Sequence, residues 1–245
     1  MSGTKVEGSS IDERKDLIAP VWHTIVLLLL LSIPIALGVL RLVNNSTAPP
    51  ETGPMHPANL WKFYAQTLIY EWILVGVVWV GIRLKQIKLK ELIGGRWPTI
   101  GHAFADLIIG AAICVTMFYI GDELGAWLKP ANGNGNSNSI NVVPQDGLEM
   151  ALWVALSATA GVVEEIVFRG YLQTQFVRFG MPLILAILAQ TFVFAVGHIY
   201  EGLFSVTVIA VYGALLGLMA AGLKSLRPLI IGHVMYDVIA VLRAT

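Results

Sequence analysis

Two adjacent glutamates, Glu164 and Glu165, interrupt one of the most apolar stretches of the chain, and Arg169 follows them closely. A charged side chain near the centre of a lipid-facing helix costs roughly 2.5–3.5 kcal/mol on insertion scales. Acids inside a membrane are therefore rare, and each is first considered as a functional residue. A carboxylate in such a place could act as the general base that activates a water molecule for hydrolysis.

Helical spacing separates the two glutamates. Consecutive residues of an α-helix point about 100° apart, so Glu164 and Glu165 cannot face one partner equally. Arg169 lies at the favourable i+4 position from Glu165, but at i+5, on a different face, from Glu164. We therefore predict that Arg169 neutralises Glu165 and leaves Glu164 free. A purely structural acid–base pair is the alternative, and it does not account for Glu164.

His198, at the end of the apolar stretch 192–198, is a candidate partner for the glutamates. Gly180 and Pro182 mark a turn between the two segments. Glu165 and His198 both lie about 22–27 Å along their helices from that turn, so an antiparallel hairpin would bring them to a similar depth. The alternative is an interfacial polar residue at a helix end.

His233 and Asp237 share one helix face because they stand at positions i and i+4. A local hydrogen bond between them is the simple interpretation. Counting along straight helices does not bring His233 to the depth of His198. We therefore expect an offset, a tilt or a break, with Gly197 or Gly202 as the breaking point.

The composition is that of a membrane protein. Of the 245 residues, 56% are hydrophobic and only 13% are charged, whereas a soluble domain carries about 25% charged residues. We predict an all-α polytopic membrane bundle of about seven (six to eight) transmembrane helices, because seven apolar segments have the required length. These segments are 21–42, 63–83, 101–121, 148–170, 182–199, 203–223 and 227–243. The net charge is zero and no basic face suggests a nucleic-acid partner, so we expect none. The single cysteine, Cys114, excludes an intrachain disulfide.

Lysine and arginine gather on one side of the predicted spans, which by the positive-inside rule is cytoplasmic. With the N-terminus inside, that side holds Lys5, Arg14, Lys15, Arg83, Lys85, Lys88, Lys90, Arg96, Arg169, Arg178, Lys224 and Arg227. The outside holds Arg41, Lys62, Lys129 and Arg243. We predict a multi-pass protein of the plasma (inner) membrane, if bacterial, with a cytoplasmic N-terminus. Its parts are a polar tail at 1–20, accessory transmembrane helices and loops at 21–147 and a catalytic core at 148–245.

Three short motifs follow one another: Glu-Glu-x-x-x-Arg at 164–169, Phe-x-x-x-His at 194–198 and His-x-x-x-Asp at 233–237. In this order they resemble the three motifs of the CPBP family, which comprises CAAX proteases and bacteriocin-processing enzymes and is also called the abortive-infection family. The resemblance covers roughly residues 148–240. It implies an intramembrane endopeptidase that cuts a membrane-embedded or membrane-anchored peptide or protein within the lipid bilayer.

The resemblance also implies a role for each residue of the first two motifs. Glu164 would be the general base that activates water. Glu165 would be secondary, oriented by Arg169. His198 would pair with the water or with Glu164.

In the third motif, His233 and Asp237 would stabilise the oxyanion or help to hold a metal. The prenyl-protein endopeptidases of the family often carry asparagine at the last position, and asparagine can donate a hydrogen bond. An ionised Asp237 cannot donate, so it would instead orient His233 or be kept protonated. Glu164, His198 and His233 also form a His₂Glu set, which makes a divalent metal such as zinc a further expectation, although the His-Glu-x-x-His motif is absent.

Other functions remain open. A non-proteolytic membrane scaffold of the same family would keep the motifs for stability. A small proton-coupled transporter would use Glu71, Asp106 and Glu164 as a relay, but no internal duplication supports it. A haem protein with His198 and His233 as axial ligands leaves the glutamates unexplained. For Glu71 and Asp106, pairing with another span is the alternative to lining a substrate cavity.

The protease interpretation makes one spatial prediction. Glu164, His198 and His233 should converge on a single polar cavity that is reachable from the cytoplasmic side. Side chains that point to different faces of the bundle would contradict this interpretation.

Overall fold

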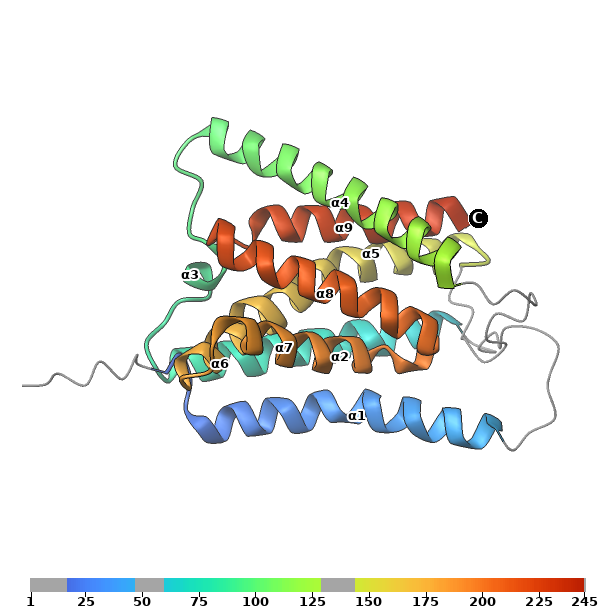
Figure 1. Cartoon of the computed structure of the whole chain (residues 1–245), viewed down its shortest axis with the longest axis horizontal. Coiled ribbons are helices and arrows are strands. Elements are labelled where there is room, and N and C mark those ends of the chain that lie inside the picture. The colour runs from blue at the N-terminus through green and yellow to red at the C-terminus, as the bar shows by residue number, and fades with distance from the viewer. Residues whose placement is uncertain (1–16, 47–59, 129–143, 245) are drawn as a thin grey trace, which may run out of the picture.

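In a computed structural model, the described residues 17–46, 60–128 and 144–244 form a bundle of helices without any strand (Figure 1). The predicted all-α membrane bundle is thereby confirmed. The predicted loops at 44–60 and 130–147 and the N-terminal tail at 1–20 lie largely outside the described residues.

The helices follow in a simple order along the chain. The first are α1 (Val21–Ser46), α2 (Leu60–Arg83), α3 (Leu89–Ile93) and α4 (Ile100–Leu128). A continuous rod then comprises α5 (Gly147–Glu164), the π-helix η1 (Glu165–Gln173) and α6 (Thr174–Arg178). The last are α7 (Leu183–Gly197), the 3₁₀ turn η2 (Ile199–Glu201), α8 (Leu203–Leu223) and α9 (Arg227–Ala244).

Five helical segments of the described chain are long and apolar enough to cross a membrane: α1, α2, α4, the rod α5–η1–α6 and α8. The other two predicted spans, 182–199 and 227–243, correspond to α7 and α9. α7 has only 15 residues, and α9 interrupts its apolar residues with His233 and Asp237. All seven predicted segments are therefore helical, but only five are both long enough and apolar enough to cross a membrane.

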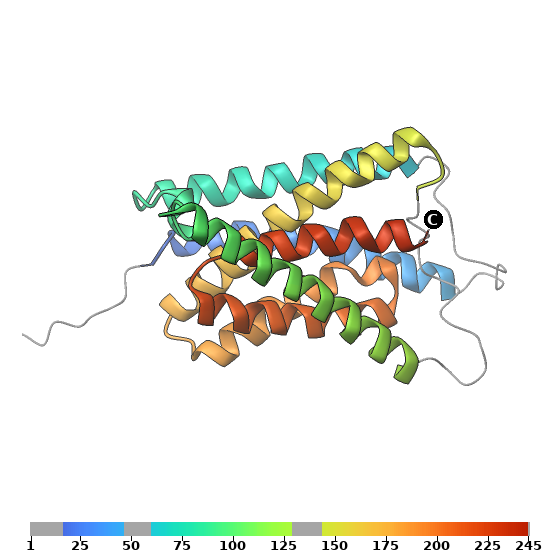
Figure 2. The ribbon, with the colours of Figure 1, turned by 90° about the horizontal axis from the view of Figure 1, so that it is seen from above.

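The rod lies at the centre of the bundle. Its α5 part packs against α2 and α9, and its π-helical part packs against α7 (Figure 2). One apolar cluster joins α1, α2, η1 and α7, while a second joins α4, α8 and α9. The polar residues in the middle of the rod therefore lie between two apolar cores.

One end of the bundle is basic. This basic end comprises the N-terminus of α1, the short helix α3 and the turns that join α6 to α7 and α8 to α9 (Figure 1). Its basic side chains are Arg83, Lys85, Lys88, Lys90, Arg96, Arg178, Lys224 and Arg227. The opposite end contains the C-termini of α1, α4 and α9, and its basic residues within the described chain are Arg41, Lys62 and Arg243.

Two glycines with positive φ angles lie where the sequence predicts a turn and a break. Gly180, with φ of 91°, lies in the turn between α6 and α7, and Gly202, with φ of 96°, lies between η2 and α8. Glycine adopts such angles without a steric penalty. The expected break near Gly197 or Gly202 is present, because α7 ends at Gly197 and α8 begins only after Gly202.

His23, which carries no sequence signal, ties α1 to the rest of the bundle. Its Nδ1 lies 2.8 Å from the hydroxyl oxygen of Tyr171, and its Nε2 lies 2.8 Å from the carbonyl oxygen of Val77. The ring packs on Gly81, where an added Cβ would lie 2.3 Å from it. A buried histidine thus joins α1 to α2 and to η1.

We expect Gly161→Ala to destabilise the fold. A Cβ at this position would lie 2.5 Å from Cγ2 of Val234 and 2.9 Å from its backbone nitrogen, so α5 and α9 would have to separate. Overpacking of this kind costs about 1–3 kcal/mol. The unfolding temperature in detergent measures the effect. Gly76→Ala is the matched control, because a Cβ there meets nothing within 4 Å. Equal unfolding temperatures for the two variants would contradict the packing described.

Candidate active site

The change from α-helix to π-helix falls between the two glutamates. α5 ends at Glu164, and the π-helix η1 begins at Glu165 and continues to Gln173, with all 9 of its residues buried. π-helical segments are rare, and they occur frequently at functional sites. The assumption of α-helical spacing through Arg169 is therefore wrong for this segment, although the i+4 pair still forms.

Glu165 and Arg169 form the predicted ion pair. Arg169 Nη1 donates to Oε1 of Glu165 at 2.9 Å, and neither side chain is exposed to solvent. Arg169 Nη2 also donates to the carbonyl oxygen of Gly213 at 3.4 Å, and the guanidinium lies 4.5 Å from the centre of the Phe194 ring. The arginine is therefore held by η1, α7 and α8 together.

Glu165 has a second partner that the spacing did not predict. His233 Nδ1 lies 3.0 Å from the same Oε1 atom. The other oxygen, Oε2, is buried and has no hydrogen-bond partner among the described residues. His233 of α9 thus adds a third member to the ion pair that Glu165 and Arg169 form within η1.

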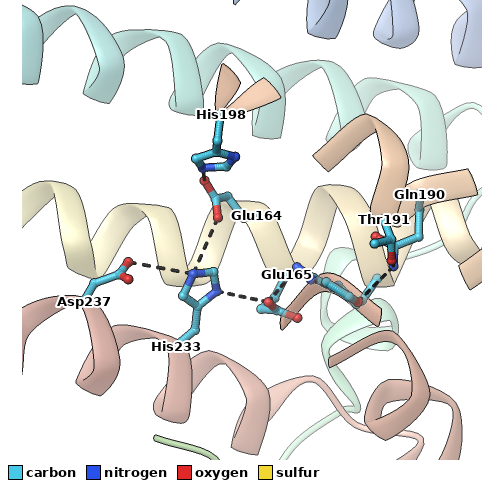
Figure 3. A network of polar contacts seen from close by, with 9 residues as sticks. Glu164, Glu165, Gln190, Thr191, His198, His233 and Asp237 are labelled. Atoms are coloured by element: carbon cyan, nitrogen blue, oxygen red, sulfur yellow. Dashed lines mark hydrogen bonds and ion pairs between the residues drawn. The ribbon is translucent and has the colours of Figure 1, made fainter. Parts of the chain in front are cut away.

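Glu164 lies between the two histidines (Figure 3). Its Oε1 is 3.6 Å from His198 Nε2, and its Oε2 is 3.6 Å from His233 Nε2. Its side chain is 15% exposed, whereas that of Glu165 is 0% exposed. His233 therefore contacts both glutamates, one through each ring nitrogen and at unequal distances. The predicted contrast between a paired Glu165 and a freer Glu164 agrees with these contacts.

His198 follows directly on the last residue of α7. Its Nδ1 lies 2.9 Å from the carbonyl oxygen of Phe194, which can only accept, so Nδ1 carries the hydrogen and Nε2 is turned toward Glu164. The ring packs edge-on against Phe194, with 5.0 Å between the ring centres, and stacks on Tyr200 at 6.1 Å. The similar depth predicted for the glutamates and His198 is confirmed.

His233 and Asp237 share a face of α9, as predicted. His233 Nε2 lies 3.7 Å from Oδ2 of Asp237 and 3.6 Å from Glu164, while Nδ1 faces Glu165. Both ring nitrogens thus face carboxylate oxygens, which suits a ring that carries a hydrogen on each nitrogen. Both histidines reach Glu164, so the difference in depth implied by straight helices does not occur.

Five of the seven motif residues line one cavity of about 640 Å³: Glu164, Phe194, His198, His233 and Asp237. The buried pair of Glu165 and Arg169 does not line it. The predicted convergence on a single cavity is confirmed. Tyr200 and Glu201 of η2 also line it, and the sequence analysis did not single them out. Glu201 carried a usable signal, because it is an acid close behind His198 between two apolar segments.

A second cavity, of about 400 Å³, lies between α1, α2 and α7 and is lined mainly by apolar residues. It shares Glu71, Glu164 and His198 with the first cavity. Glu71 is buried, and its Oε2 has no hydrogen-bond partner among the described residues. For Glu71, the interpretation as a cavity-lining acid is therefore correct.

Asp106 lies elsewhere, at the basic end. Its Oδ2 accepts hydrogen bonds from Arg227 Nε at 2.8 Å and from Trp97 Nε1 at 2.7 Å. It lines neither of the two cavities. Pairing, rather than cavity lining, is therefore correct for Asp106, and the relay that a transporter would use lacks one of its three members.

Among the described residues, the lining of the main cavity extends toward the end opposite to the basic end. Its lining includes Phe63 at the start of α2, Asp122 near the end of α4 and Arg243 in the last turn of α9. The side chains of Asp122 and Arg243 are 68% and 54% exposed and approach each other to 3.5 Å. The N-terminus of α1 lies at the other end (Figure 1). The N-terminus of α1 and this part of the cavity therefore lie at opposite ends of the bundle, and which of the two ends is cytoplasmic stays a prediction.

The predicted metal ligands Glu164, His198 and His233 lie together, but no group of three histidine, cysteine, aspartate or glutamate side chains in the described part of the chain is arranged to hold a metal ion. The zinc expectation therefore gains no support of its own from the geometry. It stays a proposal.

Residues 146–239 match a family model described as type II CAAX prenyl endopeptidase Rce1-like. The match runs from just before α5 into α9 and contains all three motifs, but it leaves out α1 to α4 and Glu71. No curated protein and no solved structure shows a significant match to the chain.

The match confirms the resemblance to the CPBP family of intramembrane proteases over this region, which is less than half of the chain. At the level of the family, the matched region is similar to a CAAX-type endopeptidase. The apolar helices agree with a multi-pass integral membrane protein.

We expect Arg169→Met and Glu165→Gln to lower stability far more than Glu164→Gln does. Breaking a buried ion pair by removing one partner costs about 3–5 kcal/mol, and the Glu165 and Arg169 side chains are 0% exposed. Unfolding temperatures in detergent measure the difference. The double variant Glu165→Gln/Arg169→Met removes both charges of the pair, so no buried charge is left without its partner. It should therefore be more stable than Arg169→Met. Equal losses for the two glutamate variants would contradict the contrast drawn between them.

Proposed function

We propose that the chain is an intramembrane endopeptidase in which Glu164 and His198 activate a water molecule. The observation that supports it most is the position of Glu164 in the cavity, 3.6 Å from the Nε2 atoms of both His198 and His233. Hydrolysis of a peptide bond needs an activated water, a base and a group that stabilises the developing negative charge. The site offers a residue for each of these tasks.

Glu164 acts as the general base. A water molecule in the cavity binds one oxygen of Glu164 and Nε2 of His198, whose Nδ1 hydrogen is engaged by Phe194. Glu164 takes a proton from this water while the water oxygen attacks the carbonyl carbon of the substrate. The distances of 3.6 Å suit this role, because catalytic hydrogen bonds are often long until the substrate is bound.

His233 stabilises the negative charge that develops on the carbonyl oxygen. Glu165 holds its Nδ1 at 3.0 Å, and Arg169 in turn holds Glu165 at 2.9 Å, so the orientation of the ring is fixed. The hydrogen on Nε2 then faces the cavity and is donated to the oxyanion. Asp237, 3.7 Å from Nε2, orients the ring and leaves the donation to His233.

Glu164 then returns its proton to the nitrogen of the leaving group. The carbon–nitrogen bond breaks, the water oxygen remains on the new carboxyl group, and the second peptide leaves as an amine. One residue thus serves first as base and then as acid. A divalent metal such as zinc, held by Glu164, His198 and His233, is an additional proposal that this route does not require.

The second candidate is a non-proteolytic membrane scaffold. The buried pair of Glu165 and Arg169 would serve it equally well. A scaffold gives no reason, however, for Glu164 to line a cavity between two histidines. The proton-coupled transporter has less support, because Asp106 is paired with Arg227 outside that cavity.

We expect Glu164→Gln to lower kcat about 10²–10⁴-fold, the usual contribution of a general base. The probe is an internally quenched peptide that ends in a farnesylated Cys-aliphatic-aliphatic-X sequence, with its unprenylated form as a second probe, in proteoliposomes. Glu91→Gln is the matched control, because Glu91 is exposed on α3 at the basic end. Equal activity of the wild type and Glu164→Gln would overturn the assignment. A folded wild type that cleaves neither probe would contradict a CAAX-type substrate.

We expect EDTA and 1,10-phenanthroline to leave cleavage of the same peptides unchanged, because no step of the proposed route uses a metal. Elemental analysis of the purified protein provides a second readout. Loss of activity that only zinc restores, together with loss of bound zinc in His198→Ala and His233→Ala, would instead establish the metal-assisted form.

A further inference from the structure

We infer that the substrate reaches the site from the extracytoplasmic side of the membrane, so that it is an exported peptide or an outward-facing segment of a membrane protein. The inference rests on the proposed endopeptidase function and adds the class of substrate. Two independent observations support this inference. The described residues leave the main cavity open at one end of the bundle, and the basic residues gather at the other end.

The basic end is closed by contacts between its turns. The backbone nitrogen of Leu226, between α8 and α9, donates to the carbonyl oxygen of Ile93 in α3 at 3.0 Å. Beside this contact, Arg227 donates to Asp106 at 2.8 Å and lies 5.4 Å from the ring centre of Trp97. None of these residues lines either of the two cavities.

The π-helix fills the interior between the basic end and the site. All 9 residues of η1 are buried, and Tyr171 and Leu172 are completely inaccessible to solvent. Gln173 Nε2 donates to the carbonyl oxygen of Gly217 at 3.0 Å, which joins η1 to α8 at this level. A peptide at the basic end would therefore have to displace packed core residues to reach Glu164.

The open end, by contrast, leads directly to the glutamate. The lining of the main cavity includes residues from the first turns of α2 and α8, from η2 and from the last turns of α4 and α9: Phe63, Asp122, Glu201, Ser205 and Arg243. The second cavity extends toward the same end through Leu37 and Arg41 of α1. Among the described residues, the lining of both cavities therefore extends toward the end opposite to the basic turns.

The distribution of basic residues assigns a side of the membrane to each end. Lysine and arginine in short connections next to helix ends stay in the cytoplasm. The connections between α2 and α4, and between α8 and α9, are of this kind and carry Lys85, Lys88, Lys90, Arg96 and Lys224. The closed end is therefore cytoplasmic, and the cavity faces outward.

Thiol labelling in intact cells tests the orientation without using activity. Cys114 is buried and is first replaced by serine, so that introduced cysteines report alone. Asp122→Cys places a thiol at the mouth of the cavity, and Glu91→Cys places one on α3 without removing a basic charge. A membrane-impermeant maleimide should label Asp122→Cys equally before and after permeabilisation, and Glu91→Cys only after it. Glu123→Cys, also exposed on α4, replaces Asp122→Cys if that variant is not produced.

A comparison of protein N-termini in cells tests the class of substrate. N-termini that appear in membrane and exported proteins with the wild-type chain, but not with Glu164→Gln, should lie in outward-facing segments.

Labelling of Asp122→Cys or Glu123→Cys only after permeabilisation would overturn the inference, as would Glu164-dependent N-termini in cytoplasmic segments. If no Glu164-dependent N-termini form, the proposed function fails, and with it the substrate class, while the labelling still decides on which side the cavity opens.

Discussion

The carboxylate of Glu165 is the group on which the geometry of the site depends. One of its oxygens contacts Arg169 in η1 and His233 in α9, at 2.9 and 3.0 Å. A carboxylate that is completely buried costs several kcal/mol unless such partners compensate it. Because Arg169 also contacts Gly213 and Phe194, this one charge connects the rod with α7, α8 and α9. The reactive position of its neighbour Glu164 is therefore set by a residue that takes no direct part in the proposed reaction.

The helix α8 contributes its backbone rather than its side chains to this arrangement. Gly213 and Gly217 stand one turn apart, and their carbonyl oxygens accept hydrogen bonds from Arg169, Gln190 and Gln173. Small residues at this spacing allow neighbouring helices to approach closely. At Gly217 an added Cβ would lie 2.9 Å from Nε2 of Gln190. The absence of side chains at these two positions thus exposes the hydrogen-bond acceptors that the polar residues of the core require.

The sequence predicted the features that local rules govern. A span must be apolar over about 20 residues, so the helices and the rare acids within them stand out, and the i+4 rule paired Glu165 with Arg169. The π-helix was not predicted, because backbone hydrogen bonds from residue i to residue i+5 cannot be recognised from amino-acid composition. The contact between Glu165 and His233 joins residues far apart in the chain. Rules of helical spacing apply only to residues that are close in sequence, so they could not predict this contact. The direction of the cavity depends on how complete helices pack, which no single segment reveals.

The early end of α7 has a consequence for water. At about 1.5 Å per residue its 15 residues extend roughly 22 Å, less than the ~30 Å hydrocarbon core of a bilayer. The chain from His198 to Gly202 therefore runs without α-helical bonding at membrane depth. Such backbone is tolerated only where protein buries it or where it lines a water-filled space. His198, Tyr200 and Glu201 line the main cavity, so this stretch of backbone requires water in that cavity wherever protein does not bury it. Water at this position would also be the reactant that the proposed hydrolysis consumes.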